Sequence, residues 1–157
     1  MALDEFGLIR RYFTRPGHAA PGLRLGIGDD DALLDLPAGE TLAFTTDTLV
    51  AGRHFPPDAL PFDIGWKALA VNLSDLAAMG ARPLGVTLAL TLPEADEAWL
   101  TAFSSGFFTL ADAHAVPLMG GDTTRGPQSN TVTALGAVTP ARALRREGAR
   151  AGDQLYV

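Results

Sequence analysis

The chain has 157 residues, a formal net charge of −6 and no cysteine, so disulfides, zinc–thiolate sites and cysteine nucleophiles are excluded. Its length allows one domain with a sizeable core, and 47% hydrophobic against 19% charged residues favours a globular chain over a disordered one. The sequence has no block of Lys or Arg that would suggest a nucleic-acid groove. It has no apolar run long enough to span a bilayer, and its acidic N-terminus M-A-L-D-E-F is unlike a signal peptide. We therefore expect a cytoplasmic protein.

The first third of the chain predicts one short helix and two strands. Residues 4–14 form an amphipathic pattern because Phe6, Ile9, Arg10 and Phe13 recur three to four positions apart. Residues 15–22 read as a loop. Residues 32–36 and 41–46 predict two strands that P-A-G-E joins as a hairpin, and residues 48–61, with three prolines, predict a further loop.

The rest of the chain predicts two long helices and several strands. The strongest helix prediction covers residues 63–79, with Asp63 as its N-cap and Gly80 just past its end. The later elements are a strand at 83–92, a helix at 94–115, strands at 116–121 and 130–138, and a turn followed by a strand at 149–157. This order predicts an α+β or mixed α/β fold, a β-sheet packed against two long helices. Because the last segment looks like a strand that is beginning, we expect the chain to be part of a longer protein.

Aspartate-bearing clusters are the main chemical signal, since 13 of the 18 acidic residues are Asp. Oxygen ligands held on short loops suit Mg²⁺, and Mg²⁺ in proteins usually accompanies phosphate. The alternative is that many of these residues only form turns. The clusters are Gly28–Asp31, Thr45–Asp47, Asn72–Asp75, Gly120–Thr124 and Ala151–Asp153.

Asp75 is the strongest single candidate for a functional residue. On the predicted helix it shares a face with Ile64 and Ala68, while the opposite face carries Leu69 and Leu76. A helix apolar on both sides is expected to be buried, and a bare carboxylate there would be costly without a metal or a charged partner. The alternative is a carboxylate that caps a neighbouring loop.

Three other clusters could hold a cation or a phosphate. Strand alternation places Thr45 and Asp47 on one side of the strand and Thr46 on the other; the alternative is an edge strand followed by a turn. Asp29, Asp30 and Asp31 repel one another unless a cation lies among them, although a polar turn also tolerates them. Gly120 and Gly121 let backbone amides approach a phosphate, with Asp122 within reach of a metal; the alternative is a glycine hairpin turn.

Few other residues suggest chemistry. His54 lies in the loop after the Thr45–Asp47 cluster and either contacts substrate or packs its ring. Arg145 and Arg146 either reach a nucleotide phosphate or form a solvated surface. The G-I-G-D-D-D string lacks the third glycine of a dinucleotide fingerprint and precedes a strand, so we reject that motif, and no Walker A, H-R-D or zinc-protease pattern is present.

Taken in order, several strings resemble thiamine-monophosphate kinase, a family in the superfamily of aminoimidazole ribonucleotide synthetase, selenophosphate synthetase and hydrogenase-maturation proteins. These strings are G-I-G-D-D-D-A, T-T-D-T-L-V-A-G-R-H-F, D-I-G-W-K-A-L-A-V-N-L-S-D-L-A-A-M-G-A, L-M-G-G-D-T-T-R-G and G-A-R-A-G-D. The likeness covers essentially all 157 residues. The long helix string and the string that ends in H-F are its most specific parts.

The resemblance implies an ATP- and Mg²⁺-dependent phosphorylation of thiamine monophosphate to thiamine diphosphate, by direct in-line transfer without a protein nucleophile. It implies a homodimer, and it makes residues 1–157 the N-terminal domain of a fold whose second domain is absent here. The implied Mg²⁺ ligands are Asp30, Thr45, Thr46, Asp47, Asp75 and Asp122; the implied ATP contacts are Gly121, Asp122 and Arg146; His54 would contact thiamine monophosphate. The alternatives are another ATP-dependent enzyme of the superfamily, such as a selenophosphate or aminoimidazole ribonucleotide synthetase, or a dimerising Mg²⁺- or nucleotide-binding fragment without turnover.

Overall fold

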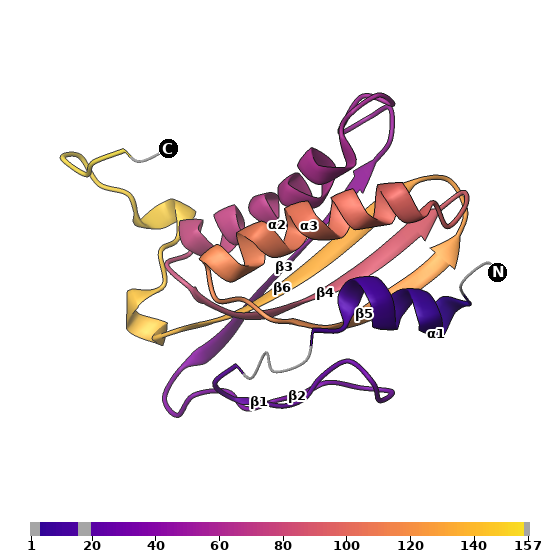
Figure 1. The fold of residues 1–157 in the computed structure, drawn as a ribbon. Helices are drawn as coiled ribbons and strands as arrows, with labels where there is room; N and C mark the ends of the chain where they lie inside the picture. Colours follow the sequence, from indigo (N-terminus) through magenta and orange to yellow (C-terminus); the bar gives the residue numbers. More distant parts are fainter. Residues whose placement is uncertain (1–3, 16–19, 156–157) are drawn as a thin grey trace.

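A four-stranded sheet covered on one face by two long helices forms the centre of the computed structural model, which describes residues 4–15 and 20–155 (Figure 1). The strand order is β3-β6-β4-β5. Strands β3 (Thr41–Val50), β6 (Ser129–Val138) and β4 (Arg82–Leu92) are successively antiparallel, and β5 (Leu118–Arg125) runs parallel to β4. The predicted α+β class is confirmed.

The two faces of the sheet differ in chemistry because side chains alternate along each strand. On β3, Thr45, Asp47 and Leu49 lie on the side of the helices, level with the buried residues of β6. Thr46 and Thr48 lie on the other, open side, where their hydroxyls bond those of Thr133 at 2.9 Å and Thr131 at 2.8 Å. The predicted alternation at Thr45–Asp47 is confirmed.

Helix α2 (Pro61–Ala78) begins two residues earlier than predicted. Leu60 is the N-cap without a side-chain hydrogen bond, and Pro61 occupies the first helical position, where its fixed φ favours helix and its missing N–H costs nothing. The prediction of Asp63 as N-cap is therefore wrong, and Asp63 lies in the first turn. The predicted end is confirmed, with Gly80 at a φ of +68° just beyond the helix.

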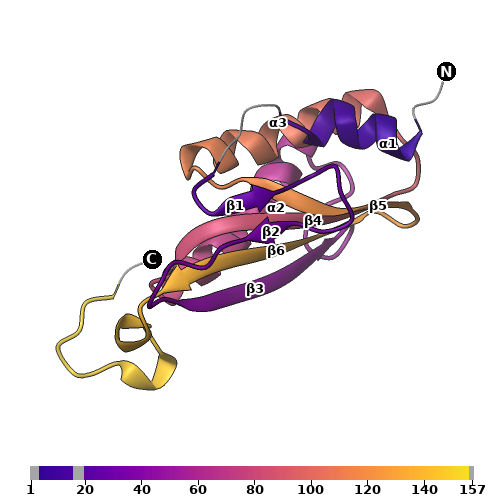
Figure 2. The ribbon, with the colours of Figure 1, turned by 90° about the horizontal axis from the view of Figure 1, so that it is seen from below.

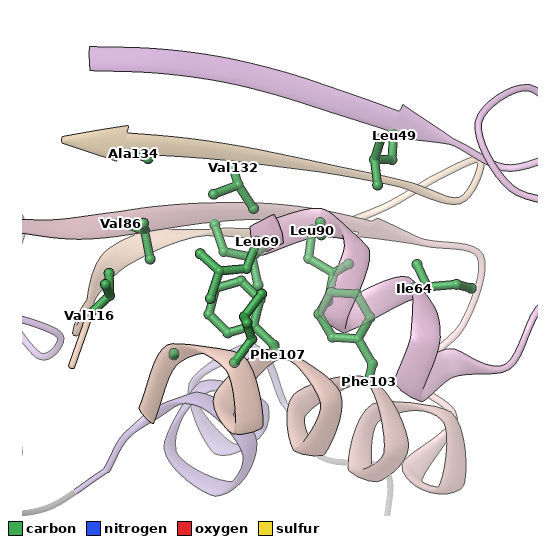
Figure 3. Close-up of a cluster of buried hydrophobic side chains, with 14 of the residues drawn as sticks. Leu49, Ile64, Leu69, Val86, Leu90, Phe103, Phe107, Val116, Val132 and Ala134 are labelled. Carbon is green, nitrogen blue, oxygen red and sulfur yellow. The ribbon is translucent and has the colours of Figure 1, made fainter. Parts of the chain in front are cut away.

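Helix α3 (Glu97–Ala113) starts at Asp96, whose carboxylate accepts hydrogen bonds from the N–H groups of Ala98 and Trp99 at 2.8 and 3.2 Å. The predicted helix at 94–115 was longer because the sequence alone did not distinguish this cap from the acidic residues before it. Phe103 and Phe107 extend from α3 into the core, where Leu69 of α2 and Leu90 and Val132 of the sheet meet them (Figure 3).

The two helices cross with their backbones in contact. A Cβ atom added at Gly65 would overlap the carbonyl oxygen of Phe103, and one added at Gly106 would overlap the carbonyl oxygen of Phe62. Only glycine allows this approach at both positions. The crossing fixes the distance between α2 and α3 above the sheet.

The N-terminal helix lies at the β5 edge of the sheet, beside α3 (Figures 1 and 2). The α-helical turn α1 (Glu5–Leu8), capped by Asp4, continues into a π-helical turn, η1 (Ile9–Phe13). The predicted helix at 4–14 is confirmed. Part of the predicted loop at 15–22, residues 16–19, lies outside the described residues.

The predicted hairpin of residues 32–36 and 41–46 is wrong. Strand β2 (Leu33–Leu34) pairs with β1 (Leu23–Leu25) in a separate two-stranded sheet on the open side of the main sheet (Figure 2). A turn does follow β2, with the Glu40 N–H bonded to the Pro37 carbonyl at 3.2 Å. The strands on either side of this turn do not pair with each other, because β3 pairs along its whole length with the distant strand β6.

After β6 the chain continues through two short 3₁₀ turns, η2 (Pro140–Arg142) and η3 (Arg146–Gly148). The predicted final strand at 149–157 is absent from its described part, which forms a turn and irregular chain up to Leu155, and residues 156–157 lie outside that part. Across residues 4–15 and 20–155, no helix is both long and apolar enough to cross a membrane.

Candidate functional site

A cavity of about 850 Å³ lies between the N-terminal helix, the loop that follows β1, and strands β4 and β5. The loop contributes the Gly28–Asp31 cluster, and β5 contributes Gly120, Gly121 and Asp122. Sequence clusters about 90 residues apart therefore line one space. Among the candidate site residues, the structure brings together Asp30, Gly121 and Asp122 here.

The glycine pair in this cavity does not form a hairpin turn, because β5 continues through it to Arg125. Gly121 has a φ of +151°, and a Cβ atom there would overlap the carbonyl oxygen of Leu88 on the neighbouring strand. A Cβ atom added at Gly120 would meet nothing within 4 Å. Gly121 is thus required by strand packing, while Gly120 leaves open space beside the backbone.

A second group lies where β3 meets α2. The Thr45 hydroxyl donates a hydrogen bond to the Asp75 Oδ2 atom at 2.7 Å, and Asp47 follows Thr45 on the same side of β3. Asp75 is exposed, so the expectation of a buried carboxylate is wrong. The buried face of α2 is formed by Ile64, Gly65, Ala68, Leu69, Asn72 and Leu76. Ile64 and Ala68, which were expected to share a face with Asp75, belong to this buried face, whereas Asp75 itself lies toward the edge strand β3.

Thr46 is separated from this second group by the sheet itself. Its hydroxyl bonds Thr133 on the open face, whereas Thr45 and Asp47 lie on the side of the helices. Strands β3 and β5 are the two edges of the sheet, so three strand spacings, about 14 Å, separate them. Within one chain, Asp47 and Asp75 therefore lie far from Asp122.

His54 lies in a compact loop directly after β3. Its Nδ1 atom accepts a hydrogen bond from the Val50 N–H at 3.0 Å, and its carbonyl oxygen accepts one from the Lys67 ammonium at 2.6 Å. The buried ring of Phe55 anchors the loop. With Nδ1 accepting, the neutral imidazole carries its proton on Nε2, and the exposed side chain presents a hydrogen-bond donor.

Arg146 begins the 3₁₀ turn η3 in the segment after β6 and is exposed. It does not line the cavity that contains Asp122. Its neighbour Arg145 forms an ion pair with Glu147. Of the proposed nucleotide contacts, the structure thus joins Gly121 and Asp122 and leaves Arg146 apart.

The donor sets fit Mg²⁺ only together with another ligand. Among the described residues, no three His, Asp or Glu side chains are grouped closely enough to hold a metal by themselves. Mg²⁺ usually keeps several waters and binds through one or two carboxylates plus substrate phosphates. Asp75 with Thr45 and Asp47, and Asp30 with Asp122, are sets of that kind.

The sequence pattern did not predict that the N-terminal helix lines the cavity, to which it contributes Phe6, Ile9, Arg10 and Phe13. Arg10 is the one charged residue of the predicted pattern Phe6, Ile9, Arg10 and Phe13, and one such charge is ordinary in an amphipathic helix. The burial of two amides was also not predicted, although one of them, Asn72, belongs to the Asn72–Asp75 cluster. Asn72 Oδ1 and both amide atoms of Asn130 have no hydrogen-bond partner in the described part of the chain.

The comparisons with known proteins agree with this fold. Residues 28–139 match the family described as AIR synthase related protein, N-terminal domain, and the chain belongs to that family. Over all 157 residues it is 58% identical to a protein of Escherichia coli (strain K12) named thiamine-monophosphate kinase. That match covers 100% of this chain and 48% of the relative, so the chain spans about half the length of the curated relatives it matches.

Solved structures lead to the same group. The crystal structure of thiamine-monophosphate kinase from Stenotrophomonas maltophilia K279a is similar with a TM-score of 0.76 and 63% identity, over 80% of this chain and 40% of that one. A structure of AaThiL complexed with AMPPCP and TMP is similar with a TM-score of 0.67 and 32% identity, over 79% of this chain and 40% of that one.

Proposed function

We propose that this chain is the N-terminal part of a kinase that transfers the γ-phosphate of ATP to thiamine monophosphate, forming thiamine diphosphate and ADP. The observation that carries the proposal is the 58% identity to a thiamine-monophosphate kinase over the whole chain. The structure complexed with AMPPCP and TMP supports a nucleotide and a thiamine phosphate as ligands of the related fold.

The proposed roles follow the two groups of side chains. Mg²⁺ would be held by Asp30 and Asp122 at the cavity, by Thr45, Asp47 and Asp75 at the β3 edge, and by Thr46 on the open face. Bound Mg²⁺ would screen the repulsion between two phosphate-bearing substrates and stabilise charge on the transferred group. Gly121 and Arg146 would contact ATP.

His54 would contact thiamine monophosphate. Its exposed Nε2–H is a suitable donor for a phosphate oxygen, and the Val50 and Lys67 contacts tie the residue to β3 and α2. A positioned donor of this kind binds and orients an acceptor phosphate without itself reacting.

The transfer is proposed to be direct and in line, with no phosphorylated protein intermediate. The chain has no cysteine, and the polar side chains at the site are mainly carboxylates and hydroxyls suited to metal binding. Incubation with γ-labelled ATP, followed by acid quenching, would trap any phosphoryl group on the protein. Stoichiometric label on the chain would refute this part of the proposal.

A homodimer is proposed because the open face of the sheet presents apolar side chains at an edge strand. Leu42, Phe44 and Val50 of β3 are all exposed, and Phe44 exposes 71% of its surface. A ten-residue edge strand with exposed apolar side chains is a ready surface for pairing with another chain.

The direct test is formation of thiamine diphosphate by the 157-residue chain with thiamine monophosphate, ATP and Mg²⁺, read by chromatography of the products. Product would establish the reaction and show that this part of the protein suffices. Binding of Mg·ATP without product would favour a nucleotide-binding part that needs the rest of its relatives' length. Turnover with another acceptor only would favour a different enzyme of the superfamily.

A further inference from the structure

The N-terminal helix forms one wall of the cavity that contains Asp30 and Asp122, and the proposed reaction gives that wall no role. Packing against the core does not account for the side chains on this side of the helix, because Phe6 and Arg10 among them are exposed. Leu8 and Tyr12 anchor it to the core, whereas Phe6, which exposes 71% of its surface, and Arg10 face the cavity.

Arg10 is the one basic side chain among the described residues that line the cavity. Five carboxylates line the same space, those of Glu5, Asp29, Asp30, Asp31 and Asp122. A nucleoside triphosphate, itself strongly anionic, would meet strong repulsion there unless cations offset those charges. Arg10 is the cation that the chain itself supplies.

The guanidinium of Arg10 is also free to bind a ligand. It makes no hydrogen bond or ion pair with any other described residue, while two neighbours on the same segment are engaged. Arg11 pairs with Glu97 at 3.2 Å, and Arg15 pairs with Asp112 at 2.6 Å. An unpaired arginine at the wall of a cavity is suited to bidentate contact with the phosphate of a bound ligand.

The helix is shaped locally around Arg10. The Thr14 N–H bonds the Ile9 carbonyl at 2.9 Å, five residues back, which closes a π-helical turn around Arg10. Because π turns also occur at the C-terminal ends of helices, this turn is an ordinary way for the helix to end at Thr14. The assignment of a binding role rests on the position and the unpaired charge of Arg10.

We propose that Arg10 binds the phosphate chain of the nucleoside triphosphate directly, and that Phe6 and Ile9 beside it face the base. The inference rests on the proposed nucleotide-binding function and adds a protein cation to its Mg²⁺-based site. It also predicts that binding weakens when the charge of Arg10 is removed, while the fold stays unchanged, since the side chain is exposed.

The test is calorimetric titration of the 157-residue chain with AMPPCP and Mg²⁺. Arg10→Met should weaken binding by roughly 10- to 100-fold, because hydrogen bonds to charged groups are the strong ones. The matched control is Arg11→Met, on the same helix but paired with Glu97 and outside the cavity, which should leave the Kd within about twofold. Arg10→Lys should recover part of the lost affinity, since lysine keeps the positive charge but lacks the planar guanidinium that makes bidentate contacts.

The outcomes separate this inference from the proposed function. Tight binding by the unchanged chain and equal binding by Arg10→Met would overturn the inference alone. No binding by the folded, unchanged chain would overturn both. A lower unfolding temperature of ligand-free Arg10→Met with an unchanged Kd would make Arg10 a structural counter-charge to the acidic loop, which also overturns the inference.

Discussion

The hydroxyl of Thr45 donates a 2.7 Å hydrogen bond to Asp75, and this contact joins strand β3 to helix α2 across 30 positions of the sequence. The bond occupies Oδ2 of the carboxylate. The other oxygen, Oδ1, has no hydrogen-bond partner among the described residues and is open to a ligand. The contact therefore orients the Asp75 carboxylate and leaves one of its oxygens available to a ligand.

Asp75→Asn is expected to abolish binding of Mg·AMPPCP or to weaken it at least about tenfold, because an amide is a poor Mg²⁺ ligand compared with a carboxylate. The free energy of unfolding should change by less than about 1 kcal/mol, since Asp75 is exposed. Calorimetric titration and urea unfolding measure the two quantities. Asp63→Asn, the same change in the first turn of the same helix, should leave binding intact. Normal binding by Asp75→Asn would remove this residue from the site.

Gly121→Ala is expected to destabilise the fold by about 2–4 kcal/mol, because the added methyl group would overlap the Leu88 carbonyl at a φ that side chains rarely adopt. Gly120→Ala should cost no more than about 1 kcal/mol, since nothing lies within 4 Å of its Cβ position. Urea unfolding of the two variants makes the comparison. Equal stability of both variants would show that β5 does not approach β4 as closely as described.

Gly106→Ala is expected to lower the free energy of unfolding by about 2–4 kcal/mol, because it would separate α2 from α3 at their crossing. Gly148→Ala, at a position with open space around it, is the control and should be neutral within about 0.5 kcal/mol. Thermal or urea unfolding measures the free energy of unfolding of both variants. An unaffected Gly106→Ala variant would contradict the backbone contact with Phe62.

Phe44→Glu is expected to convert the proposed dimer into a monomer, since it places a charge in the centre of the exposed apolar surface of β3. Light scattering after size-exclusion chromatography measures the mass. Phe62→Glu is the matched control because Phe62 is an exposed aromatic residue of α2, away from the sheet. A dimer that persists in Phe44→Glu, or a monomer in the unchanged chain, would count against a β3 interface.

The sequence predicted most elements because their patterns are local. The segments that form α2 and α3 carry long apolar periodicities, and Gly80 stops α2 by the turn chemistry that glycine allows. The hairpin prediction failed because pairing of β3 is decided by β6, which lies about 80 residues away. No local pattern in residues 32–46 specifies that partner.

The candidate site was predicted residue by residue but not as a geometry. The burial expected of Asp75 failed because the buried face of α2 takes residues from both apolar stripes, while Asp75, near the end of the helix, lies outside that face. The separation of Asp47 from Asp122 depends on strand order, which the sequence does not state. The cavity wall formed by Arg10 was missed because the residue fits an amphipathic pattern, in which a single charged position is ordinary.

The hydroxyl pairs on the open face have a consequence for the opposite face. Two cross-strand hydrogen bonds, Thr46 with Thr133 and Thr48 with Thr131, stabilise one register of β3 against β6. A slip of a single position would exchange the faces and carry Asp47 away from α2. Threonines that face solvent therefore keep a carboxylate in place on the far side of the sheet.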